Sequence, residues 1–238
     1  MKTLLLPVLV CAGCLAAGQA WTPLFDGATL NGWHVEAKPE DAAKGFWKVE
    51  DGAIVCDSRG RPDHDYVWLV SDREYADFEL RLEVQSFRTS PGNSGIQVRS
   101  RYDREAWWLD GPQVDIHPPA PWRTGLIYDE TRGWKRWIHP MLPDWNIGPE
   151  HAPAAWEWRH AGEGSGWNEI VVWCQGTRIR TIVNGRLITD RDFSGILDDE
   201  HHRARRVGLS GHIALQLHAR DELFIRFRNL ALRNLGPH

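Results

Sequence analysis

Short runs of alternating or β-branched residues recur along the chain, and Gly, Asp, Asn and Pro lie between them. Apolar residues in these runs repeat at every second position, and helical periodicity is almost absent. This pattern is typical of an antiparallel β-sandwich, because each strand buries one face against a second sheet. We therefore predict an all-β fold with ten strands, at 46–57, 66–71, 77–87, 94–102, 111–117, 124–129, 167–175, 177–185, 211–218 and 222–233.

Local cues support this fold class. Asp-Gly in VEDGAIV (residues 49–55) and Asn-Gly in IVNGRLI (182–188) lie between apolar runs, and these residue types tolerate the positive φ angles of tight hairpin turns. The run DFELRLEVQ (77–85) alternates cleanly between apolar and polar residues. Its predicted core face consists of Phe78, Leu80, Leu82 and Val84.

The first twenty residues, MKTLLLPVLVCAGCLAAGQA, have the features of a secretory signal. A lysine lies near the start, the apolar run is too short to span a bilayer, and small residues precede Trp21. We expect cleavage after Ala20 and a periplasmic or secreted protein. A lipid anchor at Cys14 is the less favoured alternative, because Cys11 stands where leucine or valine is usual.

The remaining chain, residues 21–238, has no Ser/Gly-rich or Pro-rich linker and suits one sandwich domain. No further apolar run has the length of a transmembrane helix. The net charge of −4 and the scattered basic residues argue against a nucleic-acid partner. Cys56 and Cys174 remain after signal removal, and either a disulfide or two buried free thiols would fit them.

Tryptophan is unusually frequent, with 14 residues, and residues 132–166 lack the strand pattern but contain five of them. Disordered segments are poor in aromatic residues, so we interpret 132–166 as an ordered, Trp-rich inserted loop beside a site. Exposed aromatic rings bind the faces of sugar rings, although core packing is the usual place for tryptophan. His201 and His202, in DDEHHRARR, are interpreted as part of a charged surface loop.

Several predicted strands present polar groups on one face. In GPQVDIH (111–117) Gln113, Asp115 and His117 share a face. In SGIQVRS (94–100) Gln97 and Arg99 do so, and in HIALQLH (212–218) Gln216 and His218 do so. If these strands are neighbours, we expect convergence on one cleft of Arg99, Gln113, Asp115, His117, Gln216 and His218.

Eight segments, in order along the chain, resemble the 3-keto-disaccharide hydrolase family, also known as domain of unknown function 1080. They are LFDGATLNGW, FWKVEDGAIV, YADFELRLEV, NSGIQVRS, GPQVDIH, GLIYDETRG, WNEIVV with IVNG, and IALQLH followed by FRNLAL. The resemblance implies a concanavalin A-like (LamG-like) jelly roll that acts on an oligosaccharide or glycoside. Many members have Gly-Pro-Pro after LQLH, where this chain has Arg220, Asp221 and Glu222.

Glucanases of the same fold class use a Glu-x-Asp-x-x-Glu strand, in which the outer carboxylates act as nucleophile and acid/base. The corresponding residues here are Gln113, Asp115 and Pro118. An amide cannot attack the anomeric carbon and proline cannot transfer a proton, so double displacement is not expected. The resemblance implies instead a substrate oxidised at C3, whose acidic C2 proton can be removed before the group on C1 leaves by elimination or net hydrolysis.

This chemistry needs a base, a positive group for the enolate and an acid for the leaving group. We expect His218 as the base, with Asp115 orienting it or acting itself, Arg99 at the enolate and Glu130 as the acid. One of the adjacent acids Asp129 and Glu130 is expected to shape a turn instead. The expected substrate contacts are Gln97, Gln113, His117, Tyr128, Arg132, Gln216, Trp122, Trp134 and Trp137.

A divalent metal ion is a candidate cofactor, with Asp115, His117 and Glu130 as ligands, although no short-spaced metal motif is present. The alternative function is a non-catalytic, lectin-like carbohydrate-binding module, because jelly rolls host both functions. Trp122, Trp134 and Trp137 would then be its stacking platforms. A structural interaction domain with all tryptophans buried is a third hypothesis.

Overall fold

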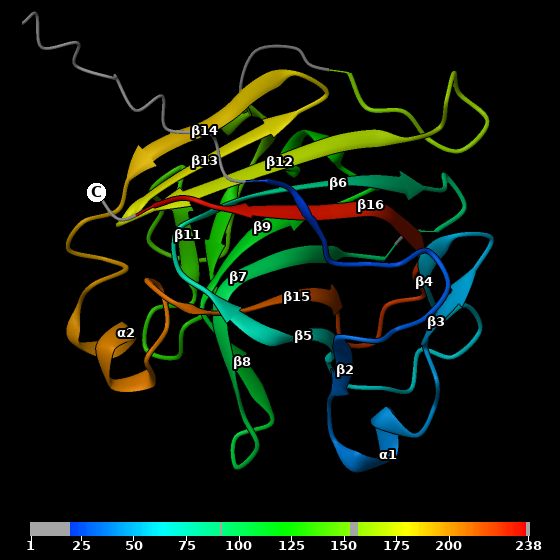
Figure 1. Ribbon diagram of the computed structural model, residues 1–238, viewed down its shortest axis with the longest axis horizontal. Helices are drawn as coiled ribbons and strands as arrows, with labels where there is room; N and C mark the ends of the chain where they lie inside the picture. Colours follow the sequence, from blue (N-terminus) through cyan, green and yellow to red (C-terminus); the bar gives the residue numbers. More distant parts are fainter. Residues whose placement is uncertain (1–19, 91, 153–156, 237–238) are drawn as a thin grey trace, which may run out of the picture.

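The computed structural model describes residues 20–236 except 91 and 153–156, so the predicted signal sequence and Cys14 lie outside the described residues. Two antiparallel sheets stack into a sandwich, which confirms the predicted jelly-roll class (Figure 1). The first sheet has the order β14-β13-β12-β6-β16-β4-β3, with β1 beside β16. The second has the order β11-β10-β9-β7-β15-β5-β2, with β8 beside β7.

The strands of the first sheet are β1 (Thr22–Pro23), β3 (Trp47–Glu50), β4 (Ala53–Asp57), β6 (Phe78–Ser86), β12 (Asn168–Gln175), β13 (Arg178–Val183), β14 (Arg186–Asp192) and β16 (Phe224–Asn234). Those of the second sheet are β2 (Trp33–Glu36), β5 (Val67–Tyr75), β7 (Ser94–Asp103), β8 (Trp108–Asp110), β9 (Pro112–Ile116), β10 (Ile127–Asp129), β11 (Arg136–His139) and β15 (Gly211–Leu217). The short helices are α1 (Pro39–Ala42), α2 (Glu200–Arg205), η1 (Pro121–Arg123) and η2 (Pro149–His151). No helix in the described ranges has the length and apolar character needed to cross a membrane.

The ten predicted ranges all contain strands, but 46–57 is two strands, β3 and β4. Strands β1, β2, β8, β11 and β14 lie outside the predicted ranges. Both hairpin turns form, and Asp51 and Asn184 adopt positive φ angles of 48° and 50°. Strand β6 alternates between buried and partly exposed residues, and Phe78, Leu80, Leu82 and Val84 are all at most 1% exposed. The core lies between the sheets and leaves the outer face of the second sheet free for other contacts.

Part of the predicted inserted loop is regular structure. Residues 136–139 form β11, which pairs with β10 at the edge of the second sheet. Hydrogen bonds to backbone therefore anchor the first third of the insertion. This pairing fixes residues 136–139 beside the sheet, whereas residues 153–156 of the insertion, with Trp156, lie outside the described residues.

The predicted disulfide alternative is wrong, because Cys56 and Cys174 are free and buried. They lie on β4 and β12, and β16 and β6 separate these strands. Strands β4 and β12 are three inter-strand spacings apart, which is about 14 Å. A disulfide needs Cα atoms within about 7 Å of each other. Burial raises the pKa of the Cys174 thiol to about 11, so the thiol stays protonated.

The expectation that Arg99 faces the cleft is also wrong. Arg99 has a φ of 53°, and the pairing of β15 with β7 changes register beside it. Such a bulge interrupts the alternation of side chains. Arg99 is fully buried, and its guanidinium donates to the Asp77 carboxylate at 2.9 Å and to the carbonyls of Ala76, Gly176 and Gly208 at 2.7, 2.5 and 3.2 Å.

Replacing Arg99 should therefore reduce stability. We expect Arg99→Ala to lower the free energy of unfolding by about 3–5 kcal/mol, because several buried acceptors lose their donor. Arg101→Ala is the matched control on the same strand, since Arg101 forms a more exposed ion pair with Glu74, and about 1 kcal/mol or less is expected there. Denaturant unfolding followed by tryptophan fluorescence measures both; equal losses would contradict a structural role for Arg99.

Candidate active site

A cleft of about 450 Å³ lies on the outer face of the second sheet. Gln113 and Asp115 on β9 form part of it, as predicted, together with His117 directly after that strand. Tyr128 and Glu130 come from β10 and its end, and His218 comes from the end of β15. The other lining residues are Tyr66, Asn93, Trp108, Arg123, Lys135, Trp137, Trp145 and Asp221.

One wall of the cleft is aromatic. The rings of Tyr66 and Trp108 meet edge-on with centroids 4.9 Å apart, and Tyr66 also stacks on buried Trp68 at 5.4 Å. Leu109 on β8 joins this second apolar cluster outside the main core. The packing of Tyr66, Trp68 and Trp108 therefore makes this wall of the cleft largely apolar.

His218 is held on three sides. Its Nδ1 lies 3.1 Å from the carbonyl oxygen of Ala219 and 3.5 Å from a carboxylate oxygen of Asp221. A proton on Nδ1 satisfies both contacts and leaves Nε2 to accept the Tyr66 hydroxyl at 3.0 Å. Burial lowers the pKa of His218, against the opposing charge of Asp221, so the imidazole is neutral at pH 7. The carboxylate beside His218 is therefore Asp221, and the expectation that Asp115 orients it is wrong.

Asp115 pairs with Arg123 instead. Arg123 Nε donates to Asp115 Oδ2 at 3.0 Å, and η1 supplies the arginine. Burial raises the pKa of Asp115 to about 6, although Arg123 lowers it. Burial, Arg123 and His218 lower the pKa of His117 to about 4. His117 is therefore neutral at pH 7, and Asp115 is mostly charged and paired.

Glu130 is the protonated carboxyl group of the cleft. Burial raises its pKa to about 8, the charge of Lys135 opposes this shift, and Asp129 adds to it. Burial in turn lowers the pKa of Lys135. The Lys135 Nζ lies 3.4 Å from the centroid of the Trp108 ring. Glu130 can thus donate a proton at neutral pH.

A buried network supports the turn that carries Glu130 and Lys135. His202 on α2 is fully buried, so its interpretation as part of a surface loop is wrong. Its Nε2 lies 3.2 Å from Asp129 Oδ2 and 3.1 Å from Thr131 Oγ1, and its Nδ1 lies 2.8 Å from Asp199 Oδ1. Burial lowers the pKa of His202, but the two aspartates outweigh burial and raise it. Asp129 also accepts the Thr131 N–H at 3.0 Å and is therefore the turn-forming member of the predicted acid pair.

Several buried polar atoms in and below the cleft have no hydrogen-bond partner within the described part of the chain. They are Gln113 Oε1, His117 Nδ1 and Asn93 Oδ1. Gly95 makes room for one of them, because a Cβ there would overlap the Gln113 carboxamide. Unpartnered buried polar groups are rare in folded proteins, and their concentration here indicates a polar ligand.

Five predicted substrate contacts do not line the cleft. Gln97 donates to the Leu109 carbonyl beneath β8, and Gln216 is buried in the sheet. Arg132 is neutralised by Asp103 and Asp110. Trp122 packs against the core, and Trp134 donates to the Asp199 carboxylate. Of the three predicted platforms, only Trp137 lines the cleft, and it is 1% exposed.

The predicted metal ligands do not form a metal-binding group. Over the described residues, no three His, Cys, Asp or Glu side chains are grouped so that they could hold a metal ion. Asp115 is already paired with Arg123 at 3.0 Å. The set of Asp115, His117 and Glu130 therefore does not fit a divalent ion.

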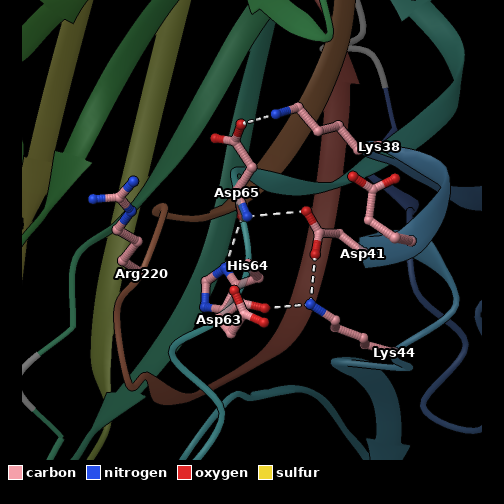
Figure 2. A pocket seen from close by; sticks show the side chains of 8 residues that line it. Lys38, Asp41, Lys44, Asp63, His64, Asp65 and Arg220 are labelled. Atoms are coloured by element: carbon pink, nitrogen blue, oxygen red, sulfur yellow. Dashed lines mark hydrogen bonds and ion pairs between the residues drawn. The ribbon is translucent and has the colours of Figure 1, made fainter.

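A second hollow, of about 510 Å³, lies beside α1 (Figure 2). Most of its charges are paired: Lys38 contacts Asp65 at 2.6 Å, and Lys44 contacts Asp41 at 2.8 Å. Arg220 lies across from these pairs. The buried acid and base of this hollow are already partnered, because Asp41 pairs with Lys44 and His64 contacts the carbonyls of Asp65 and Asp221. The cleft is therefore the better candidate for chemistry.

Sequence reasoning missed Tyr66, Arg123, Lys135, Trp108 and Trp145 as lining residues. Tyr66 directly precedes β5, Trp108 is the first residue of β8, and Arg123 belongs to the short 3-10 helix η1. Lys135 and Trp145 belong to the insertion, whose tryptophans were the only available signal. The insertion does lie beside the site, as expected, since Lys135, Trp137 and Trp145 line the cleft.

Solved structures with the same fold include three from Parabacteroides distasonis ATCC 8503, each described as a "putative glycosyl hydrolase". One is 17% identical, with a TM-score of 0.60, and the match covers 91% of this chain and 94% of the other. A second is 21% identical, with a TM-score of 0.55, covering 90% and 84%. A third is 22% identical, with a TM-score of 0.52, covering 91% and 100%. At these identities the likeness shows the fold alone.

No curated protein matches the chain. A family model, described as the 3-keto-alpha-glucoside-1,2-lyase-like domain, matches residues 20–233. This range includes every residue that lines the cleft, and it agrees with the eight segments found in the sequence. The protein is therefore a carbohydrate-related, glycosyl hydrolase-like domain, and it belongs to the 3-keto-alpha-glucoside-1,2-lyase-like family.

Proposed function

We propose that the protein cleaves 3-keto-glycosides by removing the proton at C2 and expelling the group on C1. The observation that supports this proposal is the opposite pKa shifts of two groups in one cleft. His218 has a lowered pKa and is neutral, and Glu130 has a raised pKa and is protonated. A neutral base and a protonated acid that face one cavity suit an elimination at neutral pH.

The reaction divides into two steps. The substrate displaces the Tyr66 hydroxyl from His218 Nε2, which frees the Nε2 lone pair. Nε2 then takes the C2 proton, and the electrons of the C–H bond move to the C3 oxygen as an enolate. The enolate then re-forms the C3 ketone, a double bond forms between C1 and C2, and the C1–O bond breaks. Glu130 gives its proton to the departing oxygen. Addition of water across the new double bond completes net hydrolysis.

Two other cationic side chains, Arg123 and Lys135, line the cleft, and we assign to them the charge stabilisation expected of Arg99. Arg123 lines the same cleft as His218, and we assign to it the stabilisation of the enolate oxygen. The charge of Lys135 acts on Glu130. After proton transfer, Lys135 stabilises the Glu130 carboxylate. The burial of both carboxyl groups strengthens these charge interactions.

The test is incubation of the purified protein with a 3-keto-glucoside and, in parallel, with the same glucoside before oxidation. Release of the leaving group is expected only from the ketone, because the unoxidised sugar has no acidic C2 proton. The carbohydrate-binding alternative predicts binding of unoxidised glycans with no product from either compound. That result would contradict the proposed activity.

A further inference from the structure

His202, on α2, is a fully buried histidine that does not line the cleft. Its Nε2 lies 3.1 Å from Thr131 Oγ1 and 3.2 Å from Asp129 Oδ2. These two residues stand immediately after and before Glu130 in the chain. One imidazole nitrogen therefore contacts both chain neighbours of the proposed acid.

The other nitrogen of the imidazole is tied to the start of α2. His202 Nδ1 lies 2.8 Å from Asp199 Oδ1, and the same oxygen accepts the His202 backbone N–H at 2.9 Å. The second oxygen of Asp199 accepts the indole N–H of Trp134, which lies between β10 and β11. The segment that carries Glu130 is therefore fixed to α2 through residues 129, 131 and 134.

These contacts favour a doubly protonated His202. A neutral imidazole has one N–H, so one nitrogen would direct a lone pair at a carboxylate oxygen. The imidazolium has a proton on each side, and Asp129 Oδ2 has no hydrogen-bond partner of its own in the described ranges. Burial lowers the pKa of His202, but Asp129 and Asp199 raise it above its ordinary value. Charge-assisted contacts of this kind are stronger than neutral hydrogen bonds.

Glu130 lies one residue beyond β10, where strand pairing no longer fixes the backbone. Its N–H donates to the Gly111 carbonyl at 3.0 Å, and its own carbonyl accepts the Trp108 indole N–H at 2.8 Å. The direction of its side chain also depends on the residues on either side. His202 holds both of them.

We propose that His202 is a positioning residue for Glu130: by holding Asp129 and Thr131 against α2, it keeps the Glu130 carboxyl group directed into the cleft. The inference rests on the proposed function, because it takes Glu130 as the acid that protonates the leaving group. His202 acts through Glu130 and takes no proton from the substrate.

The test uses the leaving group to report on Glu130. A 3-keto-disaccharide releases an alkoxide that needs a proton, whereas a p-nitrophenyl 3-keto-glucoside releases a stable phenolate. His202→Asn keeps a polar group near Asp199 but is too short to reach Thr131. We expect it to lower kcat/KM for the disaccharide by about tenfold, the effect of a misplaced catalytic group. For the p-nitrophenyl substrate, kcat/KM should stay within about twofold.

Two further variants separate positioning from loss of stability. His202→Gln is long enough to reach Thr131 and should restore part of the disaccharide activity. Thr131→Val removes one contact of the imidazole but keeps the side-chain shape, so it should show the same substrate preference at smaller size. His160→Asn is the matched control, because His160 is buried, contacts Ser86 at 3.2 Å and does not line the cleft. It should affect both substrates equally.

Equal losses on the two substrates in His202→Asn, or no loss on either, would overturn the positioning role. So would a further loss when His202→Asn is added to Glu130→Gln, since two residues that act through one group are not additive. If His202→Asn does not fold, Thr131→Val gives the same comparison.

If the wild-type protein converts neither substrate, the proposed function fails, and NMR decides the positioning role separately. The Trp108 indole N–H reports on Glu130, because the Glu130 carbonyl is its acceptor. Its resonance, identified by its loss in Trp108→Phe, should shift in His202→Asn and stay in place in His160→Asn. An unchanged resonance in His202→Asn would contradict the proposal.

Discussion

His218→Ala is expected to lower kcat/KM for a 3-keto-glycoside by about 10²–10⁴-fold, the usual contribution of a positioned general base. The imidazole is the neutral, partly buried base of the cleft, and Tyr66, Ala219 and Asp221 fix its orientation. Steady-state release of the leaving group measures the loss. Added imidazole should restore part of the activity, because it can enter the space left by the side chain.

His212→Ala is the matched control for this variant. His212 lies on the same strand, and its Nδ1 contacts the Ser71 carbonyl at 2.7 Å, away from the cleft. Its removal should leave kcat/KM within about twofold. Unchanged activity of His218→Ala, or a loss that His212→Ala reproduces, would remove His218 from the chemistry.

Glu130→Gln is the second large expected effect, and it depends on the leaving group. For a 3-keto-disaccharide, whose leaving alkoxide needs a proton, kcat/KM should fall by about 10²–10⁴-fold. For a p-nitrophenyl 3-keto-glucoside the loss should be about tenfold or less, because a stable phenolate leaves without protonation. Glu105→Gln is the matched control, because Glu105 is an exposed residue in the turn before β8. It should leave kcat/KM for both substrates unchanged.

The same variant should change the pH profile. Glu130 acts in its protonated form, and its pKa is about 8, so wild-type activity should fall as the pH rises through about 8. His218 acts in its neutral form, and its lowered pKa keeps the acidic limb below about 6.5. Glu130→Gln should lose the alkaline limb and keep the acidic one. An alkaline limb that persists in Glu130→Gln would contradict the role of Glu130 as the acid.

Period-two alternation was sufficient to predict the sandwich and part of the cleft. Gln113 and Asp115 both lie within β9, whose alternation is not interrupted. Their shared face could therefore be inferred from spacing alone. Glu130 and His218 lie one residue beyond regular strands and keep the predicted direction. Alternation failed at Arg99, where a bulge with positive φ turned the side chain into the core. A bulge of this kind leaves no pattern in a single sequence.

Other residues were missed because their positions depend on tertiary packing. Within the run YVWLVS, residues 67–70 are all apolar, because the first sheet covers one face of β5 and the aromatic cluster with β8 covers the other. Nothing in that run marks Tyr66 as a partner for His218. Lys135 and Trp145 occupy irregular segments whose direction is set by β11. His202 is buried by the pairing of α2 with Asp129, a contact 73 residues apart in sequence and invisible to local spacing.

The central claim is that the cleft breaks the C–H bond at C2 before the glycosidic bond, and deuterium at that carbon tests it most directly. A 3-keto-glycoside deuterated at C2 is converted in ordinary water, and the released sugar is analysed by mass spectrometry. The account predicts slower turnover than for the undeuterated substrate and a product that has lost its deuterium to solvent. Equal rates and a product that keeps the deuterium would contradict it.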